Sequence, residues 1–540
     1  SAAPFRSGAV YAVYLLAVAY CSRRILKEVW REEYFPARIL QYFLVAGGCA
    51  LILYRSAIYF HVVDDFVYHL PAGFALDDLW LGGSVLRLSS VTYLYPLLQV
   101  VFSFVIELVG IRGALLILGM VQLSWLLSLN SRFAALLFPS NYGRRWVVDI
   151  LFMGIFFNPD LVLTHETFMS DLYTVLFALE TTYALLSNAP LAWVGALIVT
   201  TILSKQSSGF FLLPLAAFGL AINIRRVALT DVLVTTGIAA AVCVFFGATY
   251  YDTGNPFSFL FNGIFASPVY PTGNFRDGRW GPEGINQVLV WPIVGPLSQR
   301  WVEFSDSTNL RALHSLFTAI PCLWSIAALV GRYRWLGAVI LGSFVLWGNQ
   351  SGYGRYQVSM TSVAWVLMLF CSRRWIPAVS STVTLVVLSV IGLSLGMSNF
   401  SRDYALRGSP LTGSLSPVFS PQSAHLLKRG ANLYGRDKPR RIYRRLSRLF
   451  RDVDAIVLVD DFSGGVSTFY AFLGSYFAKI PVLSLRALEA DWEQASLDKL
   501  SPRLRLNLAA FKERKSVLVV SDNSPMLLAK LESSRLMVDR

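Results

Sequence analysis

The chain has 540 residues, of which 55% are hydrophobic and only 15% are charged, so it is too apolar for an ordinary soluble protein. The hydrophobic residues are gathered into uncharged runs of about 15–22 residues, the length that the core of a bilayer requires. The net charge of +14 does not indicate a nucleic-acid-binding protein, because arginines cluster between these runs. Composition therefore predicts a polytopic α-helical membrane protein.

The apolar runs, taken in chain order, predict about eleven to twelve membrane spans. Each predicted inner connector is basic, as the positive-inside rule requires. Residues 91–110 are apolar enough to span, but counting them would reverse this pattern, so we expect an outer-leaflet or re-entrant helix there. The run 8–22 fits either a span or an interfacial helix. The predicted spans are 8–22, 39–54, 113–130, 146–160, 171–187, 190–203, 209–222, 231–248, 314–331, 335–349, 356–371 and 375–397, and the inner connectors contain Arg23–Arg24–Lys27, Arg132 with Arg144–Arg145, Arg225–Arg226, Arg332–Arg334 and Arg373–Arg374.

Three long segments are expected on the outer face: 55–112, 249–313 and everything after 398. Residues 1–397 form the predicted transmembrane domain, and residues 398–540 the predicted extracytoplasmic domain. Within the second domain, Asp454–Asp461, Ile480–Leu485 and Ser516–Asp522 are typical of buried parallel strands. Helical spacing over 466–478 and 498–512 then favours a small soluble α/β domain. The loop Val459–Gly465 after the first strand fits either phosphate binding or helix capping.

The acidic pair Asp64–Asp65 directly follows a predicted span on the outer face. Two adjacent carboxylates there can take a proton from an acceptor hydroxyl as a general base. They can also bind a divalent cation, such as Mg²⁺ or Mn²⁺, through hard oxygen ligands. Helix capping is the alternative, because Asp favours helix N-termini.

A second acidic cluster lies in NPDLVLTHETFMSD, between two predicted spans on the same outer face. It contains Asp160, His165, Glu166 and Asp171. Ionisable groups near a bilayer core cost several kcal/mol unless they line a polar cavity or are paired. Several together therefore favour a polar cavity, although Asp160 and Asp171 also fit helix caps.

Basic residues are expected on this outer face as well, against the usual charge rule. Lys205 lies in a short turn, Arg355 in another, and Arg276 and Arg279 in the long loop 249–313. A lipid-linked phosphate is one reason to place cations there, since the Arg fork matches phosphate oxygens. Snorkelling to lipid headgroups is the other.

These features resemble the GT-C superfamily of membrane glycosyltransferases, of the mannosyltransferase or aminoarabinose transferase type. The resemblance covers roughly residues 39–397 and rests on pattern rather than a strict signature. The chain has an additional run at 8–22 and lacks the WWD element of the oligosaccharyltransferase branch, which favours transfer of a single sugar. The segments that carry the resemblance are Asp64–Asp65, YLYPLL (Tyr93–Leu98), LSKQSSGFFLLP (Leu203–Pro214) and GYGRY (Gly352–Tyr356).

The resemblance implies a hexosyl- or pentosyltransferase that uses a polyprenyl-phosphate sugar donor and a glycan or glycolipid acceptor. Asp64 or Asp65 would be the catalytic base or, with Glu166, a ligand of a divalent cation if one is used. The acceptor site would involve His165, Glu166, Asp171 and Tyr93, and the donor phosphate would bind Lys205, Arg355, Tyr353, Arg276 and Arg279.

Two other functions fit the same pattern. The number of spans with buried charge also fits a transporter or flippase of a lipid-linked or anionic substrate, although carriers usually place such groups near the midplane. A glycan polymerase of the Wzy or ligase type is closer in chemistry, but would depend on Arg and His in a large loop. We expect the chain in a bacterial inner membrane, in contact with membrane lipids and with its C-terminal domain outside the cytoplasm.

Overall fold

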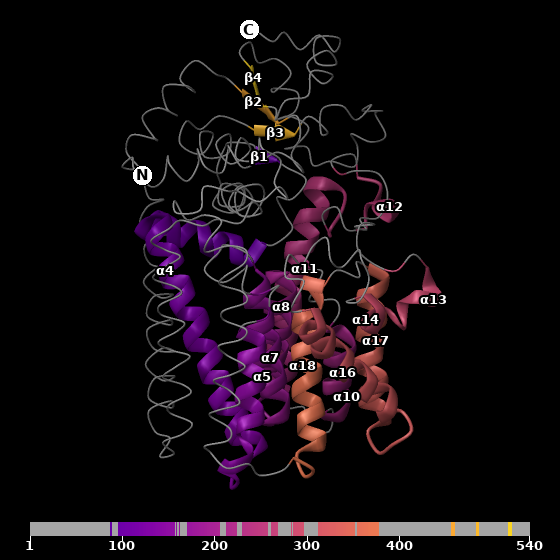
Figure 1. The fold of residues 1–540 in the computed structure, drawn as a ribbon. Coiled ribbons are helices and arrows are strands. Elements are labelled where there is room, and N and C mark those ends of the chain that lie inside the picture. Colours follow the sequence, from indigo (N-terminus) through magenta and orange to yellow (C-terminus); the bar gives the residue numbers. More distant parts are fainter. Residues whose placement is uncertain are drawn as a thin grey trace, which may run out of the picture.

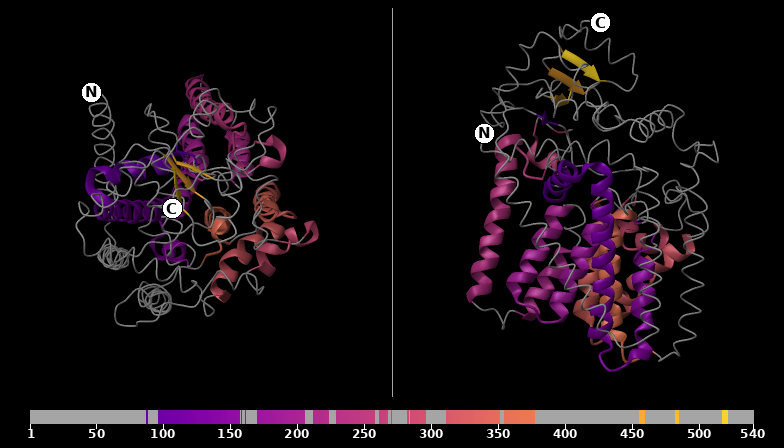
Figure 2. Two further views of the ribbon diagram at one scale, coloured as in Figure 1. Left: turned by 90° about the horizontal axis from the view of Figure 1, so that it is seen from above. Right: turned by 90° about the vertical axis from the view of Figure 1, so that its left-hand side faces the viewer.

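The computed structural model describes a helical bundle and a small parallel sheet beyond one end of the bundle (Figures 1 and 2). The structure describes residues 87–88, 96–156, 158, 161, 170–205, 212–223, 229–257, 261–267, 270, 282, 284–295, 311–350, 354–376, 455–458, 482–484 and 517–520.

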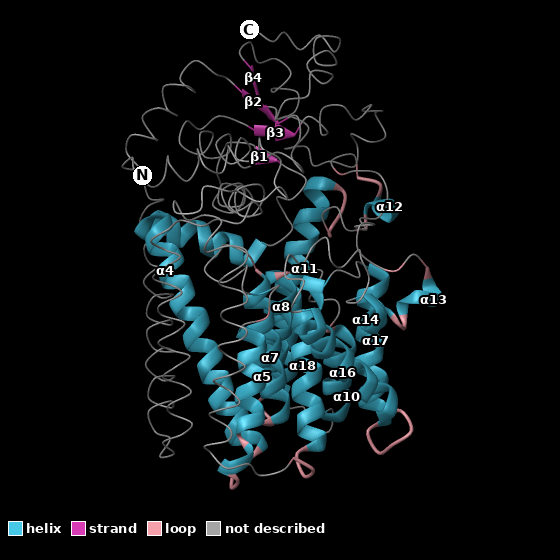
Figure 3. Ribbon diagram, viewed as in Figure 1, coloured by secondary structure: helices cyan, strands magenta, loops and turns pink. Residues whose placement is uncertain are grey.

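The helices account for most of this part of the chain (Figure 3). The longer ones are α4 (Pro96–Leu137), α5 (Trp146–Phe156), α7 (Asp171–Leu186), α8 (Leu191–Ser204), α10 (Leu213–Asn223), α11 (Leu229–Thr253), α16 (Arg311–Ala328), α17 (Arg334–Gln350) and α18 (Gly354–Ser372). The short ones are η2 (Tyr142–Arg144), α12 (Asn262–Phe265), α13 (Ile285–Val288) and α14 (Trp291–Val294).

Local sequence explains where several helices end. After α7, Asn188 adopts a left-handed conformation with φ of 56°, which Asn tolerates better than most residues. Pro190 then occupies the N-cap of α8, where its missing N–H costs nothing. The two helices therefore form a tight antiparallel hairpin, and they pack against each other along their length.

The predicted apolar runs between 146 and 371 each contain a helix with ends within a few residues of the predicted ones, so these helices are confirmed as helices. The predicted division between 91–110 and 113–130 is wrong, because residues 96–110 and 113–130 belong to the single 42-residue helix α4, and residues 91–95 lie outside the described part of the chain. Figure 1 shows that α4 bends: its first part lies across one end of the bundle, and the rest runs lengthwise. The runs 8–22, 39–54 and 375–397 lie outside the described residues.

The two ends of the bundle differ in character. The connections that contain Arg144, Arg332 and Arg373 lie together at one end, which we call the basic end (Figure 1). The sheet lies beyond the opposite end, which we call the sheet end. Because the connections at the basic end are short, successive helices alternate in direction, and α7 and α18 therefore begin at the sheet end, where α8 finishes.

The described part of the bundle has two main apolar cores. One is built by α4, α5, α7 and α18 and includes the fully buried Phe133 and Phe152. The other joins α16, α17 and α18 around Trp347, which has no exposed surface. Because α18 contributes to both cores, it connects the two halves of the bundle. In the described part of the chain, no helix satisfies both the length and the hydropathy that a membrane crossing requires.

The sheet contains four parallel strands in the order β1-β3-β2-β4. The three strands predicted in the C-terminal domain, and their parallel pairing, are confirmed as β2 (Ala455–Leu458), β3 (Val482–Ser484) and β4 (Val517–Val520). The fourth strand was not predicted: β1 (Arg87–Leu88) comes from the segment 55–112 and pairs with β3. The predicted helices at 466–478 and 498–512 lie outside the described residues.

Candidate functional site

A buried ion pair joins two helix ends at the sheet end of the bundle. Asp171 is the first residue of α7, and Lys205 directly follows the last residue of α8. The Lys205 ammonium donates a hydrogen bond to Oδ1 of Asp171, and the two side chains are only 2% and 3% exposed. A carboxylate at a helix N-terminus and an ammonium at a helix C-terminus are each favoured by the helix dipole. Each of the two charges is therefore stabilised both by the helix end at which it lies and by the opposite charge of its partner.

A third helix end contributes an aromatic ring to this pair. The ring centroid of Tyr356, in the first turn of α18, lies 4.1 Å from the Lys205 ammonium. An ammonium over a ring face is attracted by the ring quadrupole, by about 2 kcal/mol when water is excluded. The sequence identified the GYGRY element but not this ring as a contact. Its neighbour Arg355 belongs to the same first turn of α18.

The first part of α4 supports α7 beside this cluster. Phe102 and Tyr173 pack with ring centroids 5.6 Å apart, and both are buried. Tyr173 lies two residues after Asp171, within the first turn of α7. The part of α4 that crosses the end of the bundle therefore holds the helix end that carries the carboxylate.

The structure thus brings together two of the predicted site residues, Asp171 and Lys205, and places the turn that carries Arg355 next to them. The remaining predicted residues lie outside the described part of the chain: Asp64, Asp65, Tyr93, Asp160, His165, Glu166, Arg276, Arg279 and Tyr353. The expected ligands of a divalent cation, Asp64, Asp65 and Glu166, are among them. Within the described residues, no group of three or more Asp, Glu, His or Cys is placed to hold a metal ion.

A second, partly buried charge cluster joins α4 to α7 nearer the basic end. Arg132 donates to both carboxylate oxygens of Glu180, at 2.7 and 2.5 Å, and Trp125 Nε1 donates to the same group at 2.9 Å. The Arg132 guanidinium also lies 4.7 Å from the ring centroid of Tyr183. The prediction that Arg132 belongs to an inner connector is therefore wrong: it lies inside α4, where the carboxylate of Glu180 compensates the charge of its guanidinium fork.

The sequence did contain a signal for this second cluster. Glu180 is an acidic residue inside the predicted span 171–187, and a carboxylate in such a run needs a partner. Glu180 lies nine residues after Asp171, roughly 14 Å along the helix. The two clusters are therefore separate, and only the first lies at the sheet end.

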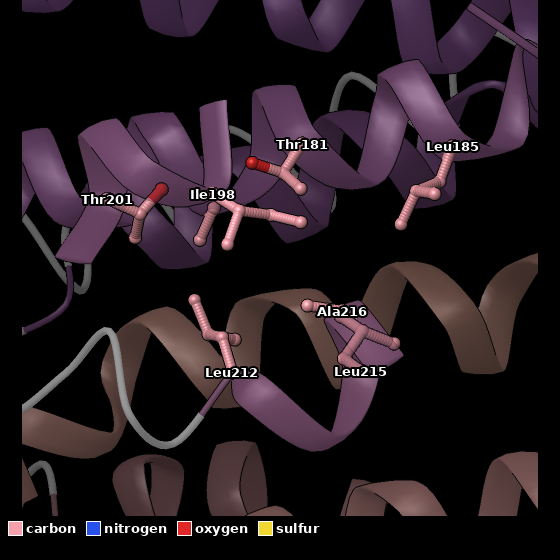
Figure 4. A pocket seen from close by; sticks show the side chains of 8 residues that line it. Thr181, Leu185, Ile198, Thr201, Leu212, Leu215 and Ala216 are labelled. Carbon is pink, nitrogen blue, oxygen red and sulfur yellow. The ribbon is translucent and has the colours of Figure 1, made fainter. Parts of the chain in front are cut away.

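A small pocket, partly open to the surface, lies between α7, α8 and α10, and its free volume of about 20 Å³ has room for roughly one water molecule (Figure 4). Its polar side chains, Thr181 and Thr201, donate their hydroxyl hydrogens to carbonyls four residues earlier in their own helices. The pocket is consequently apolar in chemistry. Thr201 lies four residues before Lys205, so the pocket begins about one helical turn from the ion pair.

Comparisons with known proteins returned no relatives: no family description matches this chain, and no curated protein or solved structure is similar to it.

Proposed function

We propose that this chain is a membrane glycosyltransferase that moves one sugar from a polyprenyl-phosphate donor to a hydroxyl of a glycan or lipid-linked acceptor. The observation that carries the proposal is the buried Asp171–Lys205 pair with Tyr356, at the meeting point of three helix ends. A buried charge pair contributes little to stability compared with an apolar pair of the same volume. Its position at one end of the bundle, rather than midway along a helix, favours chemistry at a membrane surface over passage through the bundle.

The surface of the bundle supports the membrane part of the proposal. Ile320, Leu323, Ile326 and Val330 form an exposed apolar stripe at helical spacing along α16 and just beyond it. Such a stripe needs an apolar environment. At the basic end, Trp335 and Trp375 are exposed next to arginines, a combination typical of a membrane–water interface.

The proposed reaction is a displacement at the anomeric carbon of the donor sugar. Asp64 or Asp65 accepts the proton of the acceptor hydroxyl, whose oxygen then forms a bond to that carbon. The bond from the same carbon to the phosphate oxygen breaks, and its electrons leave with the polyprenyl phosphate. Arg355 stabilises the negative charge of the departing phosphate. A divalent cation, where one is used, would be held by Asp64, Asp65 and Glu166 and would add positive charge there.

The contacts of Lys205 refine its part in this proposal. Because its ammonium is already paired with Asp171 and packed on Tyr356, it acts first as a positioning residue. It holds the first turn of α18 against the ends of α7 and α8, and that turn carries Arg355. The predicted contact of Lys205 with the donor phosphate would then follow, rather than replace, its pairing with Asp171.

The test uses purified full-length protein in liposomes with polyprenyl-phosphate hexose, labelled in the sugar, and membrane glycolipid extract as acceptor. We expect label to move to the acceptor, and Asp64→Asn or Asp65→Asn to abolish the movement. Full activity in both variants would refute the mechanism. Movement of intact donor across the bilayer, without release of polyprenyl phosphate, would instead support a flippase.

A second measurement addresses the donor site. Arg355→Ala should raise the KM for the donor by at least about tenfold and leave the KM for the acceptor nearly unchanged. Arg332→Ala, an exposed arginine at the basic end, is the matched control. An equal effect of both substitutions would mean that Arg355 does not bind the donor.

A further inference from the structure

The strand β1 ties the first outer segment to the C-terminal sheet. Arg87 pairs with Val482 and Leu88 with Leu483, in parallel register. The ladder adds β1 to the edge of β3, so a segment that precedes α4 completes a sheet otherwise made from residues after 454. Pairing of this kind uses backbone N–H and C=O groups and fixes the register of the added strand.

The same segment also connects to the candidate site. Along the chain, β1 lies between the acidic pair Asp64–Asp65 and the start of α4 at Pro96. The first part of α4 then packs through Phe102 against Tyr173, in the turn that begins with Asp171. The C-terminal sheet is therefore joined to the buried ion pair by the β1–β3 pairing, by the chain from β1 to α4, and by the packing of α4 on α7.

We infer that the C-terminal domain is a working part of the site, in which pairing of β1 with β3 positions the first outer segment for catalysis. The inference rests on the proposed function, because the acidic pair in this segment is its proposed base. An independent cap would need no strand from the segment that carries these acids. The domain therefore acts as a positioning element, and the pairing of its strand β3 with β1 of the first outer segment is the contact through which it acts.

The contact itself is tested without any substrate, by cross-linking in native membranes. In a background without the native cysteines, Leu88→Cys with Leu483→Cys should form a disulfide, because neighbouring strands lie about 4.8 Å apart. Leu88→Cys with Val519→Cys is the matched control, since β3 and β2 separate β1 from β4 by roughly 14 Å. We expect at least about tenfold more cross-linking in the first pair. Equal cross-linking in both pairs, or none in either, would overturn the inference.

The positioning role is tested with two proline variants, Arg87→Pro and Leu88→Pro. Successive residues of a strand point their N–H groups to opposite sides, so one proline removes a ladder bond and the other is tolerated at an edge. We expect one variant to lose about tenfold or more in kcat, with little change in donor KM, and the other to stay within about twofold of wild type. Wild-type rates in both would overturn the inference.

A rescue experiment separates positioning from misfolding. The defective proline variant is combined with a disulfide at the other register pair, Arg87→Cys with Val482→Cys or Leu88→Cys with Leu483→Cys. Oxidation should restore kcat to within about threefold of wild type, and reduction should remove it again. A disulfide that forms but does not restore activity would overturn the positioning role. An inactive wild-type protein would refute the proposed glycosyl transfer, while the cross-linking result would still decide whether β1 and β3 pair.

Discussion

A tryptophan of α18 supplies the hydrogen bond that a proline inside α16 cannot make. Pro321 lies inside α16 and has no N–H, so the carbonyl of Phe317, four residues earlier, loses its helical donor. Trp365 Nε1 of α18 donates to that carbonyl at 2.6 Å, and its ring stacks on Phe317 with centroids 5.8 Å apart. The indole therefore replaces the missing backbone donor and links the two helices.

The substitution Trp365→Phe keeps an aromatic ring but removes the donor. It should lower the free energy of unfolding by about 1–2 kcal/mol, the cost of leaving a part-buried carbonyl without a partner. In a Pro321→Ala background the helix regains its own N–H, so the same substitution should cost at least about 1 kcal/mol less. The difference between the two backgrounds is the predicted coupling between Pro321 and Trp365.

The four proteins of this cycle can be compared by equilibrium unfolding in mixed detergent micelles, followed by the loss of helical circular dichroism. Trp375→Phe, at an exposed tryptophan beyond α18, is the control for the loss of an indole and should be nearly neutral. The same cost for Trp365→Phe in both backgrounds would show that the indole does not serve the carbonyl that Pro321 leaves without a donor.

The same unfolding assay tests three further contacts. Lys205→Met should destabilise the protein by about 3–5 kcal/mol, because it leaves the charged and buried Asp171 without its ammonium partner. Adding Asp171→Leu should recover most of this loss of stability. If the double variant is no more stable than Lys205→Met, the broken pair is not the cause of the loss. Glu180→Gln should lower the free energy of unfolding by less, about 1–3 kcal/mol, because the side chain of its partner Arg132 is 23% exposed and keeps contact with water. An unchanged stability would contradict the two-bond pairing of Arg132 with Glu180. Gly337→Ala should cost about 1–3 kcal/mol, since an added Cβ would lie 2.5 Å from the backbone carbonyl oxygen of Ser325 in α16, whereas Gly247→Ala meets nothing within 4 Å and should be neutral or stabilising.

The helices could be predicted from the sequence because local sequence determines their lengths and their ends. Uncharged runs set the lengths, and residues such as Asn188 and Pro190 set the ends. The expectation that Asp171 and Lys205 share one end of the bundle follows from alternation of helix direction. Their direct contact could not be predicted, because it depends on the exact crossing of α7 and α8.

The errors have equally physical causes. A charge rule assigns an arginine between apolar runs to a connector, but Arg132 is compensated by a carboxylate on another helix and so remains inside α4. The contact of Tyr356 with Lys205 joins residues about 150 positions apart and leaves no local pattern. The two-residue strand Arg87–Leu88 is too short to show a period of its own, and its extended structure depends on pairing with the edge of β3.

The two charge pairs differ in burial and in geometry, and this difference supports the choice of the candidate site. Arg132 presents a rigid fork to Glu180 with two parallel bonds and a third from Trp125, a geometry that specifies one partner. Lys205 instead presents a compact ammonium on a flexible stem, and the carboxylate of Asp171 and the ring of Tyr356 both stabilise its charge. Asp171 is stabilised in turn by the N-terminus of α7. Full burial of a compact ion pair where three helix ends meet favours the sheet end as the candidate site, whereas the partly exposed arginine fork is suited to holding two helices together.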